Sequence, residues 1–221
     1  MNELSDIEEL IKKALGELIS IYDEKGSSSR MIFPESRKTK TKEPQRRISE
    51  QEAVFLLTRE IELSKTFFYS VEAPTSKPYI FKKENPETAE NGSSGSIDIC
   101  VYINKDAKKR SYLLEFKAHS PKQKMFDKDF LKLKTDDSET LTNYFIHIIY
   151  QCEKRTLENV VKKYAKSLNS IREYHSGSKI KICLCLLGNF PKYGTEERIF
   201  FFNEEDILDK LKKIIEKIYA K

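Results

Sequence analysis

Two neighbouring segments decide the fold: SIDICVYI at residues 96–103 and SYLLEFKA at residues 111–118. In both segments apolar residues alternate with other types, as they do in β-strands, where successive side chains point to opposite faces. The apolar positions are Ile97, Ile99, Val101 and Ile103 in the first segment and Tyr112, Leu114, Phe116 and Ala118 in the second. The turn-like stretch NKDAKKR joins the two segments, so we expect an antiparallel β-hairpin.

The apolar faces of this hairpin fix its register. They must lie on the same side of the sheet, because a slip of one residue would turn one of them toward water. Ile99 then faces Leu114 or Phe116, and Asp98 faces Glu115 or Lys117. The core alone therefore predicts that Asp98, Glu115 and Lys117 gather on the opposite face.

Composition indicates one globular domain with a substantial core. The chain has 221 residues, of which 38% are apolar and 34% charged, and its net charge of +5 favours anionic partners mildly. The four cysteines form no C-x-x-C pair, which favours reduced core residues of a cytoplasmic, intracellular protein over a zinc site or a disulfide. The N-terminus lacks the apolar core of a signal peptide, and no apolar run approaches the ~20 residues of a membrane span, so we expect no membrane association.

The remaining sequence divides into three regions: an N-terminal amphipathic helix in residues 1–25, a basic linker or arm in 26–47, and the main domain in 48–221. In that domain, Ser49 and Glu52 form a capping-box pattern at the start of a helix. We expect helices at 48–63, 122–134, 140–173 and 204–220, strands at 65–74, 77–83, 179–187 and 198–203, and a polar loop at 84–96. This order predicts an α/β (α+β) fold with a central mixed sheet flanked by helices.

The three charged residues of the hairpin have a chemical use. Two close carboxylates, Asp98 and Glu115, can bind Mg²⁺, which prefers oxygen ligands and keeps several waters. Lys117 can orient or deprotonate a water, or neutralise charge that develops on a phosphate. A role as base requires that its pKa fall from ~10.4. The alternative is a structural ion pair on a solvated sheet face.

Residues 49–187 resemble the PD-(D/E)XK nuclease superfamily, which has the restriction-endonuclease-like fold. The resemblance rests on the order of elements and on GSID at 95–98 and LEFK at 114–117. It implies that Asp98 and Glu115 bind the metal and that Lys117 is the catalytic lysine. It also implies an acid from the first core helix, Glu52 or else Glu60, although Glu52 has an alternative role in the capping box. The Pro that the family has before its Asp is Ile97 here.

Several other residues are candidates for the same chemistry. Lysines of the helix at 122–134 and arginines of the arm could contact a nucleic-acid backbone, the alternative being a solvated surface: Lys122, Lys124, Lys128, Lys132 and Lys134, with Arg46 and Arg47. The apolar side of that helix comprises Met125, Phe126, Phe130 and Leu133. His119 is a candidate phosphate contact, His147 fits a core position, and Gln151 could reach the site from the helix expected at 140–173.

The resemblance implies a nuclease that uses Mg²⁺, or Mn²⁺ in its place, and we expect it to be an endonuclease of a restriction, defence or repair type that acts on DNA. The alternative is a non-catalytic member of the same fold that binds nucleic acid or protein. A homodimer or a partner subunit stays open, with the N-terminal helix either at such a contact or, as we favour, packed on its own domain.

Overall fold

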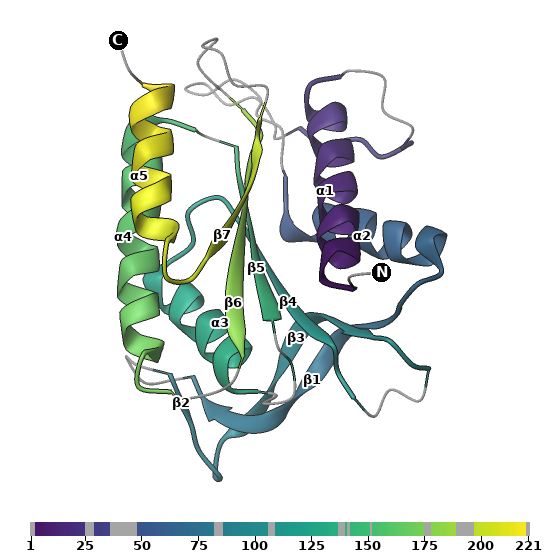
Figure 1. Ribbon diagram of the computed structural model, residues 1–221, viewed down its shortest axis with the longest axis vertical. Coiled ribbons are helices and arrows are strands. Elements are labelled where there is room, and N and C mark those ends of the chain that lie inside the picture. The colour runs from purple at the N-terminus through teal and green to yellow at the C-terminus, as the bar shows by residue number, and fades with distance from the viewer. Residues whose placement is uncertain are drawn as a thin grey trace.

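The computed structural model describes residues 3–24, 29–35, 48–81, 86–105, 109–136, 140, 142–150, 152–174, 178–188 and 197–219. Their helices are α1 Glu3–Tyr22, α2 Glu50–Ser64, α3 Gln123–Thr135, α4 Lys154–Ile171 and α5 Ile207–Ile218. Their strands are β1 Phe68–Ile80, β2 Glu87–Thr88, β3 Ser93–Tyr102, β4 Tyr112–Ala118, β5 Thr142–Ile149, β6 Lys179–Leu186 and β7 Ile199–Asn203. Together these described residues form a mixed α/β structure with one seven-stranded sheet (Figure 1).

The strand order in the sheet is β2-β1-β3-β4-β5-β6-β7. The predicted hairpin is present: β3 and β4 are antiparallel, with Ile99 opposite Leu114 and Val101 opposite Tyr112. Strands β4, β5 and β6 are parallel to one another, and the outer pairs of the sheet are antiparallel. Helix α3 connects β4 to β5, and α4 connects β5 to β6, as parallel neighbours require a crossover.

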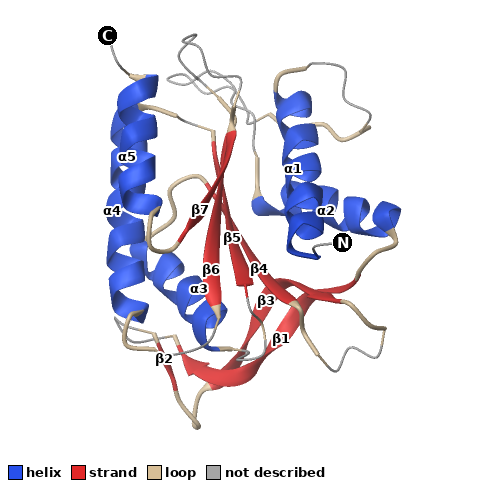
Figure 2. Ribbon diagram, viewed as in Figure 1, coloured by secondary structure: helices blue, strands red, loops and turns tan. Residues whose placement is uncertain are grey.

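Helices cover both faces of the sheet, with α1 and α2 on one side and α3, α4 and α5 on the other (Figure 2). Each side has its own hydrophobic core. In β4, Leu114 and Phe116 belong to the core under α1 and α2, whereas Leu113 belongs to the core under α3, α4 and α5. The alternative of an ion pair on a solvated sheet face is therefore wrong in its solvation, since helices cover the second face of the hairpin as well (Figure 2).

Helix α1 packs on its own chain, as we favoured. Its apolar stripe, including Ile7, Ile11 and Leu18, is buried in the same core as Leu56 of α2 and Ile146 of β5. The stripe is thus already used within the fold.

The helix expected at 140–173 is confirmed only over α4, Lys154–Ile171, because the first part of that stretch forms strand β5 instead. Every described side chain of β5 is buried, since its neighbours β4 and β6 flank it and helices cover both faces. A strand buried on both faces is mostly apolar on both and lacks the alternation that identifies a strand in sequence. The strands expected at 65–74 and 77–83 are one strand, β1, whose register shifts between Pro74 and Pro78. The loop expected at 84–96 contains β2 and the start of β3.

The core positions expected for the cysteines are confirmed, since Cys100, Cys152, Cys183 and Cys185 are all buried. Across the described ranges, none of the helices has the length and apolar character that crossing a lipid bilayer demands.

Candidate functional site

The hairpin brings together the three charged residues that its register predicted. Continuing the pairing by one residue beyond Ile99 and Leu114 places Asp98 opposite Glu115. The backbone N–H of Phe116 donates a 2.6 Å hydrogen bond to Asp98 Oδ2, and Lys117 Nζ donates a 2.7 Å hydrogen bond to the Phe116 carbonyl. Facing side chains of an antiparallel pair start about 4.5–5.5 Å apart at Cβ, so the carboxylates of Asp98 and Glu115 share one small region.

Helix α3 adds two charged residues to this region that the sequence did not assign to it. Asp129 Oδ2 lies 2.9 Å from Lys117 Nζ, and Asp129 Oδ1 lies 3.0 Å from Lys132 Nζ. Lys132 also pairs with Glu115 Oε1 and donates a 2.7 Å hydrogen bond to the Ser96 carbonyl. Lys132 was expected on the basic side of the helix, as a nucleic-acid contact or as a solvated lysine, and its burial in these ion pairs contradicts both interpretations.

The sequence held a signal for Asp129, although not for its partners. Asp129 stands three residues after Phe126 and four before Leu133, so it lies on the apolar stripe of α3. A carboxylate on a stripe that must face the sheet needs a buried cation, and Lys132 and Lys117 both supply one.

The acid that α2 contributes is Glu50, whereas the sequence favoured Glu52. Glu50 Oε2 lies 3.6 Å from Lys117 Nζ, and Glu50 Oε1 accepts a 3.1 Å hydrogen bond from the backbone N–H of Ala118. Glu52 instead accepts hydrogen bonds from the Ser49 hydroxyl and, at 2.8 Å, from the Ser49 backbone N–H. Glu60, the second choice, pairs with its neighbour Arg59 at 3.0 Å. The capping box is confirmed, and it holds Glu52 at the helix start.

We call the six residues Glu50, Asp98, Glu115, Lys117, Asp129 and Lys132 the carboxylate–lysine cluster. Four of its members are buried, with exposed fractions of 1% for Glu115, 5% for Lys117 and 2% for both Asp129 and Lys132. Asp98 is half-buried, and the side chain of Glu50 is 39% exposed. A ligand from solvent would therefore reach the cluster past Asp98 and Glu50.

Burial makes three of the carboxylates hard to ionise. It is the main cause that raises the pKa of Asp98 and of Glu50, and the neighbouring lysines and backbone N–H groups offset it in part. Burial likewise raises the pKa of Glu115 well above its usual range, helped by the negative charge of Asp129. A cation near these groups would favour their charged forms.

The lysines of the cluster remain positively charged. Burial disfavours the ammonium of Lys117, but the carboxylates of Asp129, Glu50 and Glu115 outweigh it and raise the pKa of Lys117. The pKa of Lys132 is raised in the same way by Glu115 and Asp129. Asp129 is buried too, yet Lys132 and Lys117 together lower its pKa. Because Lys117 stays protonated, it can neutralise negative charge on a bound phosphate. Its neighbouring carboxylates oppose the loss of a proton that a general base requires.

The fit of a metal ion is partial. Within the ranges that the structure describes, no three His, Cys, Asp or Glu side chains are arranged to hold a metal ion. The cluster does supply a facing pair of carboxyl groups, Asp98 and Glu115. Two carboxylates suit Mg²⁺, which usually takes the rest of its ligands from water and substrate phosphates. The donor set therefore fits a hydrated cation at Asp98 and Glu115 and does not fit an all-protein cage.

The basic residues expected to contact nucleic acid are only partly described. Lys122 and Lys124 are exposed at the start of α3, and Lys128 Nζ lies 4.6 Å from the centre of the Phe81 ring. Met125, expected on the apolar side of α3, is instead 39% exposed. Arg46, Arg47 and Gln151 lie outside the described residues.

The two described histidines join the end of β4 to its surroundings. His119, with a φ of 65°, has its ring Nε2 2.7 Å from the Ile48 carbonyl. The fully buried His147 donates from Nε2 to the His119 carbonyl at 2.6 Å, and its Nδ1 accepts from the Tyr164 hydroxyl at 2.8 Å. The core position expected for His147 is confirmed, and both rings serve as structural links.

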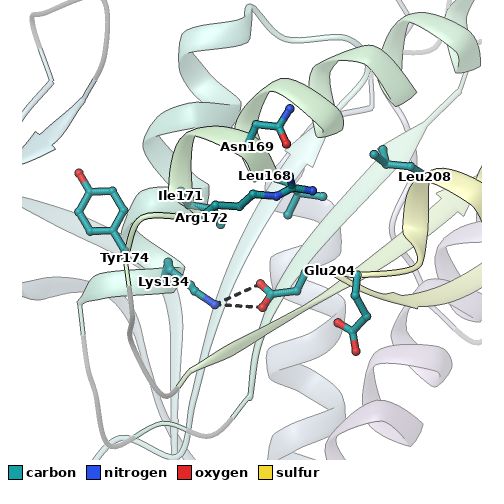
Figure 3. Close-up of a pocket in the computed structure, with 9 residues that line it drawn as sticks. Lys134, Leu168, Asn169, Ile171, Arg172, Tyr174, Glu204 and Leu208 are labelled. Atoms are coloured by element: carbon teal, nitrogen blue, oxygen red, sulfur yellow. Dashed lines mark hydrogen bonds and ion pairs between the residues drawn. The ribbon is translucent and has the colours of Figure 1, made fainter.

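A separate pocket of about 430 Å³ lies between the C-terminal ends of α3 and α4 and the start of α5 (Figure 3). Lys134 crosses it to pair with Glu204 at 3.0 Å. None of the six residues of the carboxylate–lysine cluster lines this pocket. The carboxylate–lysine cluster and this pocket are therefore two separate sites on the fold.

Comparisons of the chain with protein-family models, with curated proteins and with solved structures found no match.

Proposed function

We propose that this protein is a metal-dependent nuclease with a restriction-endonuclease-like core, and that it hydrolyses phosphodiester bonds in DNA. The observation that carries the proposal is the facing pair Asp98 and Glu115 on adjacent antiparallel strands, with Lys117 on the same face two residues later. The order α2, β1, β3, β4, α3 and β5, in which α3 crosses over to a parallel strand, supports the same fold.

Each residue of the site has a role in this proposal. Asp98 and Glu115 hold Mg²⁺ or Mn²⁺, and the bound cation would polarise a phosphodiester oxygen and acidify a water. Lys117, which stays an ammonium, neutralises negative charge that develops on the phosphate. Glu50 and Asp129 hold the Lys117 ammonium in place through ion pairs of 3.6 and 2.9 Å.

A second candidate is a non-catalytic protein of the same fold that binds nucleic acid or a protein partner. The burial of the ion pairs favours it, because Glu115 is 1% exposed and already paired with Lys132. A buried network of this kind can also be a purely structural feature. The two candidates differ in whether a divalent cation binds at Asp98.

The test is a cleavage assay on plasmid, linear duplex, single-stranded DNA and RNA, each with Mg²⁺, Mn²⁺ or EDTA. The variants are Asp98→Asn and Lys117→Met, with Lys210→Met as a control at an exposed lysine of α5. We expect cutting that requires the metal, persists in the control and is lost in both site variants. Cutting in EDTA, or full activity of both site variants in folded protein, would contradict the proposal. Absence of cutting together with absence of metal binding would favour the second candidate.

A further inference from the structure

The ammonium of Lys132 occupies the centre of a small oxygen cage. It contacts the Ser96 carbonyl of β3 at 2.7 Å, Asp129 of its own helix at 3.0 Å, and one carboxylate oxygen of Glu115 on β4. Only 2% of the residue is exposed. These oxygens come from three elements that the fold brings together, and they resemble the oxygen ligands of a hard metal ion.

This arrangement conflicts with a metal at the same carboxylate. Glu115 is one of the two ligands in the proposed nuclease site, yet one of its oxygens is bonded to Lys132. A divalent cation and an ammonium close to one another repel strongly in a buried site, where the effective dielectric constant is low. The divalent cation and the Lys132 ammonium therefore cannot both pair closely with the Glu115 carboxylate.

We propose that Lys132 is an internal cation that competes with the divalent metal for Glu115, so that metal binding requires Lys132 to release this carboxylate. The inference rests on the proposed function and identifies what controls metal occupancy there. Asp129 makes the exchange feasible, because it pairs with Lys132 from the same helix at spacing i,i+3. After release, Asp129 and the Ser96 carbonyl still satisfy the ammonium, so that no buried charge is left unpaired.

Asp129 further couples the two lysines. One of its oxygens lies beside Lys132 and the other beside Lys117. A shift of Lys132 toward Asp129 would change how firmly Asp129 holds Lys117. Metal occupancy and the position of the proposed catalytic lysine are therefore linked through one carboxylate.

The first test compares metal binding in the wild type and in Lys132→Met, using melting temperature and calorimetry with Mn²⁺ and Mg²⁺. Lys134→Met is the matched control, since Lys134 lies on the same helix and pairs with Glu204 instead. Removal of the competing charge should tighten the apparent Kd by about tenfold or more and enlarge the metal-induced rise in melting temperature. The control should match the wild type, and Asp98→Asn added to Lys132→Met should abolish the gain. Unchanged affinity in folded Lys132→Met would overturn the proposal.

The second test uses the wild-type chain and so does not depend on the folding of a variant. The side-chain nitrogen of Lys132 is observed by NMR in ¹⁵N-labelled protein, with and without Mg²⁺. Loss of the bond to Glu115 should shift the Lys132 Nζ signal when Mg²⁺ is added, and Asp98→Asn should prevent the shift. An unchanged Lys132 signal at saturating Mg²⁺ would overturn the proposal.

The two proposals can fail separately. Tighter metal binding by Lys132→Met without cleavage of any nucleic acid would sustain the competition and refute the nuclease. Metal-dependent cleavage by the wild type, with equal metal affinity in both proteins, would sustain the nuclease and refute the competition.

Discussion

The carboxylate of Asp129 lies 2.9 Å from the ammonium of Lys117, and both side chains are almost fully buried. Replacing Asp129 with Asn should therefore leave Lys117 and Lys132 without their shared counter-charge. Loss of one partner of a buried ion pair costs about 3–5 kcal/mol of unfolding free energy. Urea denaturation of Asp129→Asn measures this cost, with Asp209→Asn at an exposed site of α5 as the control. Equal stability of the two variants would mean that Asp129 is not the anchor of the cluster.

The two acidic residues in the first turn of α2, Glu50 and Glu52, should differ in what their substitution impairs, which is cleavage for Glu50 and stability for Glu52. Glu50 contacts Lys117, so Glu50→Gln should lower metal-dependent cleavage by about tenfold or more while the fold persists. Glu52 caps the helix, so Glu52→Ala should retain cleavage and lose about 0.3–1.5 kcal/mol of stability. Cleavage rates and melting temperatures of the pair provide the measurement. The reverse pattern would return Glu52 to the site and remove Glu50 from it.

The sequence predicts the hairpin well because β3 and β4 alternate apolar residues with others. Asp98, Glu115 and Lys117 follow from that register without any knowledge of the rest of the fold. Strand β5 was missed for a physical reason: parallel neighbours and helices bury both of its faces, so its pattern resembles that of a buried helix.

The remaining half of the cluster depends on tertiary packing. Lys132 looks like one of several surface lysines of α3, and only the packing of α3 on the sheet carries it to Glu115. The sequence likewise places Glu50 and Glu52 in the same helical turn. The choice between them depends on how α2 crosses the end of β4, where the Ala118 N–H meets Glu50.

The buried His147 should make the protein less stable in acid. Burial lowers its pKa from 6.5 to about 3. Between these values the unfolded chain binds a proton that the folded chain excludes, so unfolding free energy should fall as pH drops, by at most ~1.4 kcal/mol per pH unit from this group. The raised pKa of Glu115 acts in the opposite direction, since the folded chain then keeps a proton that the unfolded chain has lost.

The comparison with His147→Gln isolates the histidine contribution, because Gln can bond to both partners of the ring and does not titrate. Urea denaturation at several values between pH 3.5 and 7 gives the two profiles. We expect the advantage of the wild type over the variant to shrink as the pH falls. A difference that stays constant over this range would show that His147 is not held neutral by the fold.

The exposed lysines at the start of α3 should control nucleic-acid affinity if this helix contacts the phosphate backbone. Lys122→Glu with Lys124→Glu should weaken DNA binding at low salt, and it should make the slope of log K against log salt shallower by roughly 0.9 for each lost contact with a duplex. Lys212→Glu with Lys213→Glu, at exposed positions on α5, changes the net charge equally and serves as the control. Equal effects of the two double variants would mean that overall charge, and not α3, attracts the nucleic acid. Fluorescence anisotropy with a labelled duplex at several salt concentrations provides both the affinities and the slopes.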